Sequence, residues 1–170
     1  MKKFLLIIDG PMGVGKTTVA RILHEKIRQT AHIGLDQIKW LVSGFQRTPV
    51  QNEMTRAVVM AMAGEYLRQG VSVILEQGMK KEQIAVYKKL AKRYKAKYFI
   101  FRLSASKEVL FERVRKRPSK SGRPKISNAR LLRNYRFHLA NRHTEGIEIN
   151  AEKMIPEEIA KRILKELKAR

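Results

Sequence analysis

The chain has 170 residues, 44% of them hydrophobic, which predicts one globular domain, residues 1–170, with a core of its own. It contains no cysteine, which excludes disulfides and thiolate metal sites and fits a reducing compartment, so we expect a cytoplasmic protein. The 37 Lys and Arg against 15 Asp and Glu give a net charge of +22. Because the acids are too few for balanced ion-pair networks, this charge indicates binding to a polyanion such as RNA or DNA.

The first apolar run is interpreted as a buried strand rather than as a signal peptide. FLLIID follows two lysines, but it is only six residues long and ends in Asp9 and a glycine-rich turn. No other apolar stretch approaches the roughly 20 residues that a membrane span needs. We therefore expect a soluble protein with no membrane partner, and nothing in the sequence indicates an obligate protein partner.

Strand-like and helical patterns alternate along the chain. Runs that are continuously apolar, β-branched or aromatic predict five strands, at 3–8, 31–34, 71–75, 98–103 and 146–149. Helical spacing of apolar residues predicts helices from Lys16, from Asp36, over 51–69, over 80–93, from Ser106 to about Arg117, over 127–141 and from Pro156. This alternation predicts an α/β fold with a doubly wound, five-stranded parallel sheet.

The stretch GPMGVGKT, residues 10–17, matches G-x-x-x-x-G-K-[ST], with a predicted strand before it and a predicted helix after it. In such a P-loop, backbone N–H groups surround phosphate oxygens, Lys16 reaches the β- and γ-phosphates, and the Thr17 hydroxyl takes a Mg²⁺ position. The alternative is a glycine-rich structural turn. The motif predicts that ATP and Mg²⁺ bind here, with these nucleotide-binding residues: Gly10, Pro11, Met12, Gly13, Val14, Gly15, Lys16, Thr17 and Thr18.

The rest of the sequence narrows the class of P-loop protein. We find no Asn-Lys-x-Asp segment of the kind that reads guanine in GTPases. An AAA-type or motor ATPase would need more chain for a second module. The remaining class is a small phosphotransferase that closes a lid over its substrates.

Polar residues at the ends of two predicted strands are candidates for catalysis. Asp36 follows the second strand at the sheet edge where ligands gather, and its carboxylate could accept the proton of an attacking hydroxyl or only cap a helix. Lys39 lies one turn later and could hold an acceptor phosphate or remain solvated. Glu76 ends the third strand and could support Mg²⁺ or the substrate, or be a buried structural carboxylate. Gln77 is a candidate acceptor contact.

The most basic segment of the sequence predicts the lid. Residues 111–136 contain ten Lys and Arg against a single acid, Glu112. Arg113 and Arg117 lie four apart, hence on one helix face, and could hold the transferring phosphoryl group as catalytic residues. A solvated charged helix is the alternative. We expect the lid at about residues 113–130.

With these residues in place, the chain resembles the small P-loop kinases, which include polynucleotide 5′-hydroxyl kinases, chloramphenicol phosphotransferases, gluconate kinases and zeta-type toxins. GPMGVGKT resembles the phosphate loop of the family. HIGLDQIK resembles the segment that carries the catalytic Asp and the acceptor-phosphate contact of polynucleotide kinases, which implies these roles for Asp36 and Lys39. FERVRKRPSKSGRPKISNARLLRNYRFH resembles their lid, which implies phosphate contacts for Arg113 and Arg117. EINAEKMIPEEIAKRIL resembles the C-terminal strand, loop and helix of the family.

The resemblance implies a kinase whose acceptor is the 5′-hydroxyl of a polynucleotide. One departure concerns the acceptor, because EQG at 76–78 stands where polynucleotide kinases tend to keep an Asp. Two alternatives therefore stay open. The first is a small-molecule kinase acting on a nucleoside, sugar or antibiotic, and the second is a nucleic-acid-binding ATPase that transfers no phosphoryl group.

Overall fold

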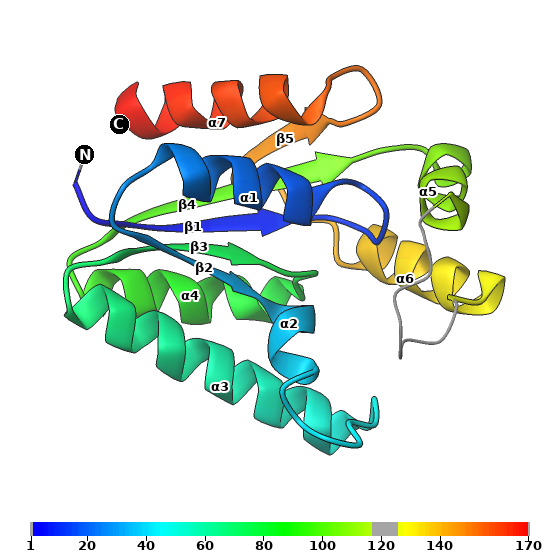
Figure 1. The fold of residues 1–170 in the computed structure, drawn as a ribbon, viewed down its shortest axis with the longest axis horizontal. Helices are drawn as coiled ribbons and strands as arrows, with labels where there is room; N and C mark the ends of the chain where they lie inside the picture. The colour runs from blue at the N-terminus through cyan, green and yellow to red at the C-terminus, as the bar shows by residue number, and fades with distance from the viewer. Residues whose placement is uncertain (1, 117–125, 170) are drawn as a thin grey trace.

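The computed structural model describes residues 2–116 and 126–169 (Figure 1). Its strands are β1 (Phe4–Asp9), β2 (Thr30–Gly34), β3 (Ser72–Glu76), β4 (Lys97–Ser104) and β5 (Ile147–Asn150). Its helices are α1 (Lys16–Lys26), α2 (Leu35–Lys39), α3 (Pro49–Arg68), α4 (Lys81–Arg93), α5 (Lys107–Arg115), α6 (Asn128–Ala140) and α7 (Pro156–Ala169). The order of elements agrees with the expectation from the sequence.

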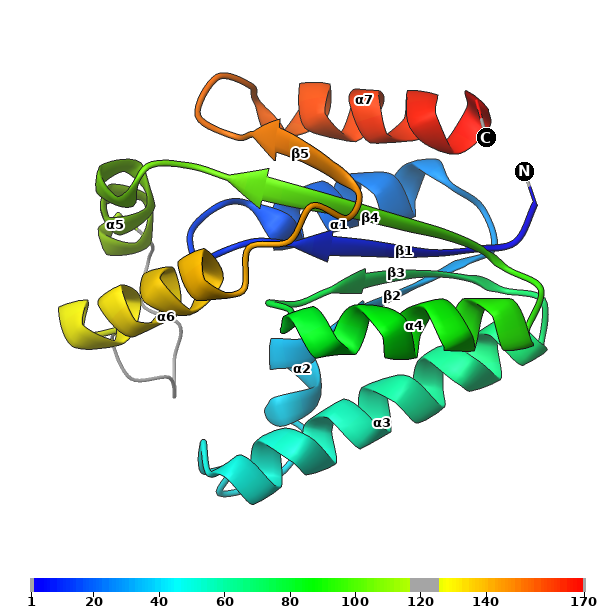
Figure 2. The same cartoon turned by 180° about the vertical axis from the view of Figure 1, so that it is seen from behind.

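The five strands form one parallel sheet in the order β2-β3-β1-β4-β5. Helices α1 and α7 cover one face, whereas α3 and α4 cover the other (Figures 1 and 2). Helices α5 and α6 lie beyond the carboxyl ends of the strands. The predicted doubly wound α/β fold is confirmed, and its topology places ligands at that carboxyl edge.

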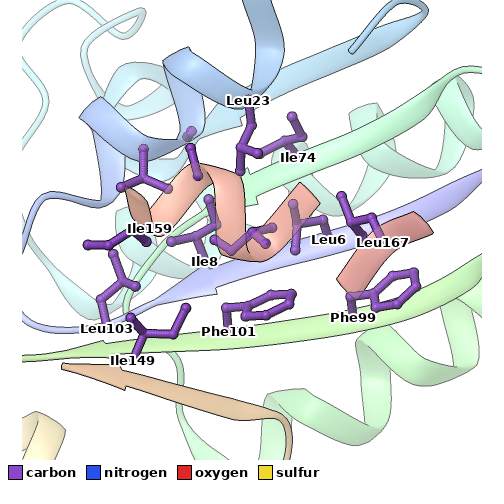
Figure 3. Close-up of a cluster of buried hydrophobic side chains, with 14 of the residues drawn as sticks. Leu6, Ile8, Leu23, Ile74, Phe99, Phe101, Leu103, Ile149, Ile159 and Leu167 are labelled. Carbon is purple, nitrogen blue, oxygen red and sulfur yellow. The ribbon is translucent and has the colours of Figure 1, made fainter. Parts of the chain in front are cut away.

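Alternating side chains of β1 explain why this strand lies in the middle of the molecule. Phe4, Leu6 and Ile8 enter the core beneath α1 and α7, where Phe101 and Leu23 join them (Figure 3). The intervening residues 5 and 7 enter the core beneath α3 and α4. A strand buried on both faces is expected to be a continuous apolar run, as residues 4–8 are.

Two helix boundaries differ from the predicted ones by two residues. Helix α3 begins at Pro49 rather than at residue 51, because Thr48 caps it by accepting a hydrogen bond from the N–H of Gln51 at 3.2 Å. Proline suits the first helical position, where its missing N–H is not needed. Helix α5 ends at Arg115 rather than at about residue 117.

Part of the predicted lid falls outside the structural description. Arg117 and the loop at 118–125 lie outside the described residues, so the catalytic role expected for Arg117 stays a prediction. Among the residues that the structure does describe, no helix combines the length and the apolarity needed to cross a bilayer.

Candidate active site at the carboxyl edge of the sheet

The loop between β1 and α1 has a conformation that requires glycine. Gly10 and Gly13 have φ angles of +145° and +93°, which side chains rarely allow. A Cβ atom on Gly10 would lie 2.4 Å from the carbonyl oxygen of Leu103, and one on Gly13 would lie 2.8 Å from that of Leu110. The loop therefore packs directly on β4 and α5, and it leads into the N-terminus of α1, where backbone N–H groups and the helix dipole favour phosphate.

Hydrogen bonds connect this loop to Lys16 and to α6. The Nζ of Lys16 donates to the carbonyl oxygens of Gly10 at 2.7 Å and Pro11 at 2.9 Å, which holds the ammonium group over the loop. The N–H of Met12 donates to Oδ1 of Asn134 in α6 at 2.7 Å. The phosphate loop and the helix that follows the predicted lid are thus in direct contact.

Thr17 and Glu76 meet at the end of β3, as a shared metal site would require. The Thr17 hydroxyl donates to Oε1 of Glu76 at 3.1 Å, and Glu76 is only 7% exposed. Gly34 on the neighbouring strand leaves room for this carboxylate, since a Cβ atom there would lie 2.7 Å from Oε1. Gly34 is therefore a supporting residue that the sequence pattern did not single out.

The oxygen atoms of Thr17 and Glu76 fit Mg²⁺. Hydroxyl and carboxylate oxygens are hard ligands, and Mg²⁺ in nucleotide sites takes its other ligands from phosphates and water. In the described part of the chain, no group of three or more His, Cys, Asp or Glu side chains could hold a metal ion.

A pocket of about 290 Å³ adjoins the phosphate loop. It is lined by Gly13, Val14, Gly15, Thr18, Val19, Arg113, Ala151, Met154, Pro156 and Ile159. Its apolar walls come from α1, α7 and the β5–α7 connection, next to where the loop would hold phosphates. A larger hollow of about 490 Å³ is lined by residues 107–116 alone and contains nothing from the phosphate loop, so size does not identify the site.

Arg113 lies in the smaller pocket. Its guanidinium donates to the carbonyl oxygen of Ala151 at 2.9 Å. This contact holds Arg113 on the α7 side of the loop. The predicted contact of Arg113 with the transferring phosphoryl group stays a prediction.

Asp36 lies just beyond β2, in the first turn of α2, and its side chain is 60% exposed. It does not cap that helix, because no side-chain hydrogen bond caps α2. Its Oδ1 lies 3.3 Å from Nζ of Lys39 and 3.6 Å from the guanidinium of Arg47. The structure thus brings Asp36 and Lys39 together. It also places Arg47, which the sequence did not indicate, next to Asp36.

The cations around Asp36 keep its carboxylate ionised. Partial desolvation raises the pKa of Asp36, but Lys39, Arg47 and Lys16 outweigh this effect and lower the pKa below the usual 3.8. For Lys39, burial lowers the pKa, and Asp36 opposes that shift. An exposed carboxylate that is ionised at neutral pH and coupled to Lys16 of the phosphate loop is suited to accept a proton from a hydroxyl.

Further cations surround Asp36 from separate elements. Arg130 of α6 interacts electrostatically with both Asp36 and Arg47, and Arg56 of α3 interacts with Lys39. The guanidinium of Arg47 lies 5.7 Å from the ring centre of Trp40, which holds it in place by a cation–π contact. We call Lys39, Arg47, Arg56 and Arg130 the acceptor cations.

Gln77 points inward rather than toward the acceptor cations. It is 3% exposed, and its Oε1 accepts a hydrogen bond from the Tyr87 hydroxyl at 3.3 Å. The acceptor contact expected of Gln77 stays a prediction, and in this conformation the side chain contacts the middle of α4.

A buried polar cluster lies under α6. Asp9 accepts a hydrogen bond from the N–H of Met79 at 2.9 Å, and its carboxylate lies 3.4 Å from Nε2 of His143 and 3.8 Å from Nδ1 of His138. Arg102 donates to the carbonyl oxygen of His138 at 2.9 Å. Burial, Lys16 and Arg102 lower the pKa of His138 to about 3, so it is neutral at pH 7. The cluster fastens α6 to the ends of β1 and β4.

Sequence comparison places the chain in a family. The family described as AAA domain matches residues 5–140, from β1 to the end of α6. The chain belongs to this family. The match agrees with the P-loop family expected from the sequence, and the expectation that the chain is too short for a two-module AAA-type ATPase stays a prediction.

Solved structures share the fold of this AAA domain. A sugar kinase from Janibacter sp. HTCC2649 has a TM-score of 0.71 at 17% identity, covering 98% of this chain and 95% of that one. A gluconokinase from Sinorhizobium meliloti 1021 has a TM-score of 0.63 at 18% identity, covering 93% and 87%. The Pnkp1/Rnl/Hen1 RNA repair complex has a chain with a TM-score of 0.70 at 20% identity, covering 82% and 45%.

These comparisons confirm the resemblance of the AAA domain to small P-loop kinases. At these identities the similarity establishes the fold, and no curated protein sequence matches the chain. The acceptor must therefore be inferred from the site itself.

Proposed function

We propose that the protein is an ATP- and Mg²⁺-dependent kinase that transfers the γ-phosphoryl group to the 5′-hydroxyl end of RNA or DNA. The observation that carries the proposal is Asp36, an exposed carboxylate coupled electrostatically to Lys16 and bordered by Lys39 and Arg47. An ATPase that only hydrolyses ATP has no need of acceptor cations beside its carboxylate.

The phosphate loop and its neighbours would hold the nucleotide. Loop N–H groups and Lys16 bind the β- and γ-phosphates, and the base occupies the pocket lined by Arg113 and Met154. Thr17 and Glu76 would hold Mg²⁺, which when bound neutralises phosphate charge.

Asp36 activates the acceptor. It accepts the proton of the hydroxyl, whose oxygen forms a bond to the γ-phosphorus. The bond between that phosphorus and the β–γ bridging oxygen breaks, and its electron pair stays on the departing ADP. Lys16 stabilises the charge that develops on this oxygen.

The charge around Asp36 favours an anionic acceptor over a neutral one. The acceptor cations come from α2, α3, α6 and the α2–α3 connection, and Lys39 is only 8% exposed. Among the described residues, Asp36 and Glu53 are the carboxylates that pair with these four cations, so a neutral sugar or nucleoside would leave an excess of positive charge in the closed complex, which costs free energy. A phosphate next to the reacting hydroxyl, as in a polynucleotide, would neutralise them.

The test is transfer of γ-labelled phosphate from ATP with Mg²⁺. We would offer 5′-hydroxyl RNA and DNA oligonucleotides, 5′-phosphorylated versions of the same oligonucleotides, and a panel of nucleosides and sugars. The control is the Lys16→Ala variant, which removes the phosphate contact of the loop.

We expect label on the 5′-hydroxyl oligonucleotides only, with at least a hundredfold loss in the Lys16 variant. Label on a nucleoside or sugar and not on oligonucleotides would show that the acceptor is a small molecule rather than a polynucleotide. Label found only as free phosphate would replace the kinase by an ATPase.

A further inference from the structure

A second basic surface lies outside the site described above. Residues 80–97, which include α4, contain eight Lys and Arg against one acid, Glu82. The buried side of α4 consists of Ile84, Tyr87 and Ala91, which pack on the sheet. The exposed side carries five cations, which we call the α4 basic face: Lys81, Lys88, Lys89, Lys92 and Arg93.

The cations of the α4 basic face are mostly unneutralised. Within the described residues, Lys88 is its only member that forms an ion pair, with Glu145 at 2.7 Å. Arg93 lies over the ring of Tyr94 at 5.6 Å, which leaves its charge in place. Like charges so closely spaced repel each other, and a bound polyanion relieves that repulsion.

Helix α7 provides an internal comparison. It has similar length and lies on the opposite side of the sheet (Figure 1). Its cations, Lys161, Arg162, Lys165 and Lys168, are interspersed with three acids, Glu157, Glu158 and Glu166. The high net charge of the protein is therefore concentrated on some surfaces, and α4 is one of them.

The α4 basic face begins at the active-site edge. Gly34 and Glu76 are register partners at the ends of β2 and β3, and Asp36 and Lys80 follow these two adjacent strand ends. The start of α4 is fastened to the same edge, because Met79 donates to Asp9. From there α4 runs back along the sheet toward the opposite edge, for about 20 Å (Figure 2).

We infer that the α4 basic face binds the phosphate backbone of the acceptor nucleic acid downstream of its 5′ end. This inference rests on the proposed function for the identity of the acceptor, and it extends the contact from the terminal nucleotide to several nucleotides. Lysines contact phosphates without reading bases, so the binding is independent of sequence. Long acceptors should therefore bind more tightly than dinucleotides.

The experiment measures binding of a fluorescent 20-nucleotide single-stranded DNA with a 5′-hydroxyl, by anisotropy, without ATP. The α4 variant is Lys81→Gln, Lys89→Gln and Lys92→Gln, three positions with no ion pair among the described residues. The matched control is Lys161→Gln, Arg162→Gln and Lys165→Gln on α7, which removes the same charge from exposed positions. Both variants would also be tested for label transfer to a 5′-hydroxyl dinucleotide and to the 20-mer.

Loss of three single-strand phosphate contacts lowers the slope of log affinity against log salt by about 2. Raising the salt from about 50 to about 200 mM lowers the affinity of the wild type by some factor. In the α4 variant only, that factor should be roughly 20-fold smaller. The KM for the 20-mer should rise, whereas the kinetics with the dinucleotide should stay unchanged.

Two results would overturn the inference: equal losses in the α4 and α7 variants, which would reduce the effect to net charge, or unchanged binding in the α4 variant. Loss of binding in the α4 variant of a protein that labels no oligonucleotide would uphold the basic face while refuting the proposed transfer. The two proposals therefore fail separately.

Discussion

At the scale of single residues, the proposed transfer depends on how Asp36 is kept charged. Its side chain is 60% exposed, so a substrate can reach it, yet Lys39 and Arg47 lie within 4 Å of its Oδ1. A general base must be ionised at the working pH, and its oxygen must be accessible to the proton that it accepts. When a substrate phosphate binds, Lys39 and Arg47 can pair with it, and the carboxylate of Asp36 can then accept a hydrogen bond from the substrate hydroxyl.

The pH dependence of transfer tests this arrangement. Because its pKa lies below 3.8, Asp36 should hold kcat/KM constant on the acid side down to about pH 5. Removing a cation disfavours the carboxylate and raises its pKa, so Arg47→Ala should move the acid limb to higher pH. We would compare pH profiles of wild type, Arg47→Ala and the remote control Arg162→Ala. An acid limb that stays in place in the Arg47 variant would contradict the account.

The sequence predicted Asp36 and Lys39, because both follow a strand in a short helix whose geometry is regular. It did not predict Arg47, since that residue reaches the site through the connection between α2 and α3, whose path no periodicity specifies. Its place is set by tertiary contacts such as the one with Trp40.

At the scale of elements, α6 links the predicted lid to the phosphate loop. Asn134 accepts a hydrogen bond from the N–H of Met12. The C-terminal end of α6 is held by Arg102 and by the cluster around Asp9. Gly78 makes room for this contact, because a Cβ atom there would lie 2.8 Å from Nε2 of His138. The position of α6 therefore depends on a histidine that is buried and neutral.

This burial predicts a pH-dependent stability. His138 has a pKa of about 3 in the folded protein against 6.5 when unfolded, so the unfolded state binds more protons between these values. The free energy of unfolding should fall by about 1.4 kcal/mol per pH unit below 6.5 because of this residue. His138→Gln should remove that part of the acid sensitivity, whereas replacing the exposed His24 by Gln should not.

Urea unfolding at pH 7 and pH 5.5 measures the difference. If the His138 variant lost as much stability on acidification as wild type and the His24 control did, the buried neutral histidine would not be the cause.

The order of elements was predictable, because alternating strand and helix patterns and the glycine motif are local signals. The Asp9 cluster was not, since its histidines come from α6 and the connection after it, far along the chain. A polar residue that ends a strand gives no sign of a partner from so distant an element. The inward orientation of Gln77 toward Tyr87 is a tertiary contact of the same kind.

At the scale of the whole molecule, the parallel sheet places the candidate site residues at one edge, and the helices determine where the charged side chains lie. The phosphate loop, Glu76 and Asp36 lie at the carboxyl ends of three neighbouring strands, β1, β3 and β2. The acceptor cations and the α4 basic face begin at the same edge, whereas α7 on the opposite side is nearly balanced in charge. Net charge could be read from the sequence, but its arrangement required the fold.

The most direct test of this account is single-turnover transfer from γ-labelled ATP to a 5′-hydroxyl oligonucleotide by Asp36→Asn, with ATP affinity measured on the same preparation. Asn keeps the size of the side chain but cannot accept the proton. We predict that transfer falls by roughly 10²- to 10⁴-fold while ATP binds as in wild type. Transfer at the wild-type rate in this variant would contradict the central claim, because Asp36 would then not be the base that activates the acceptor.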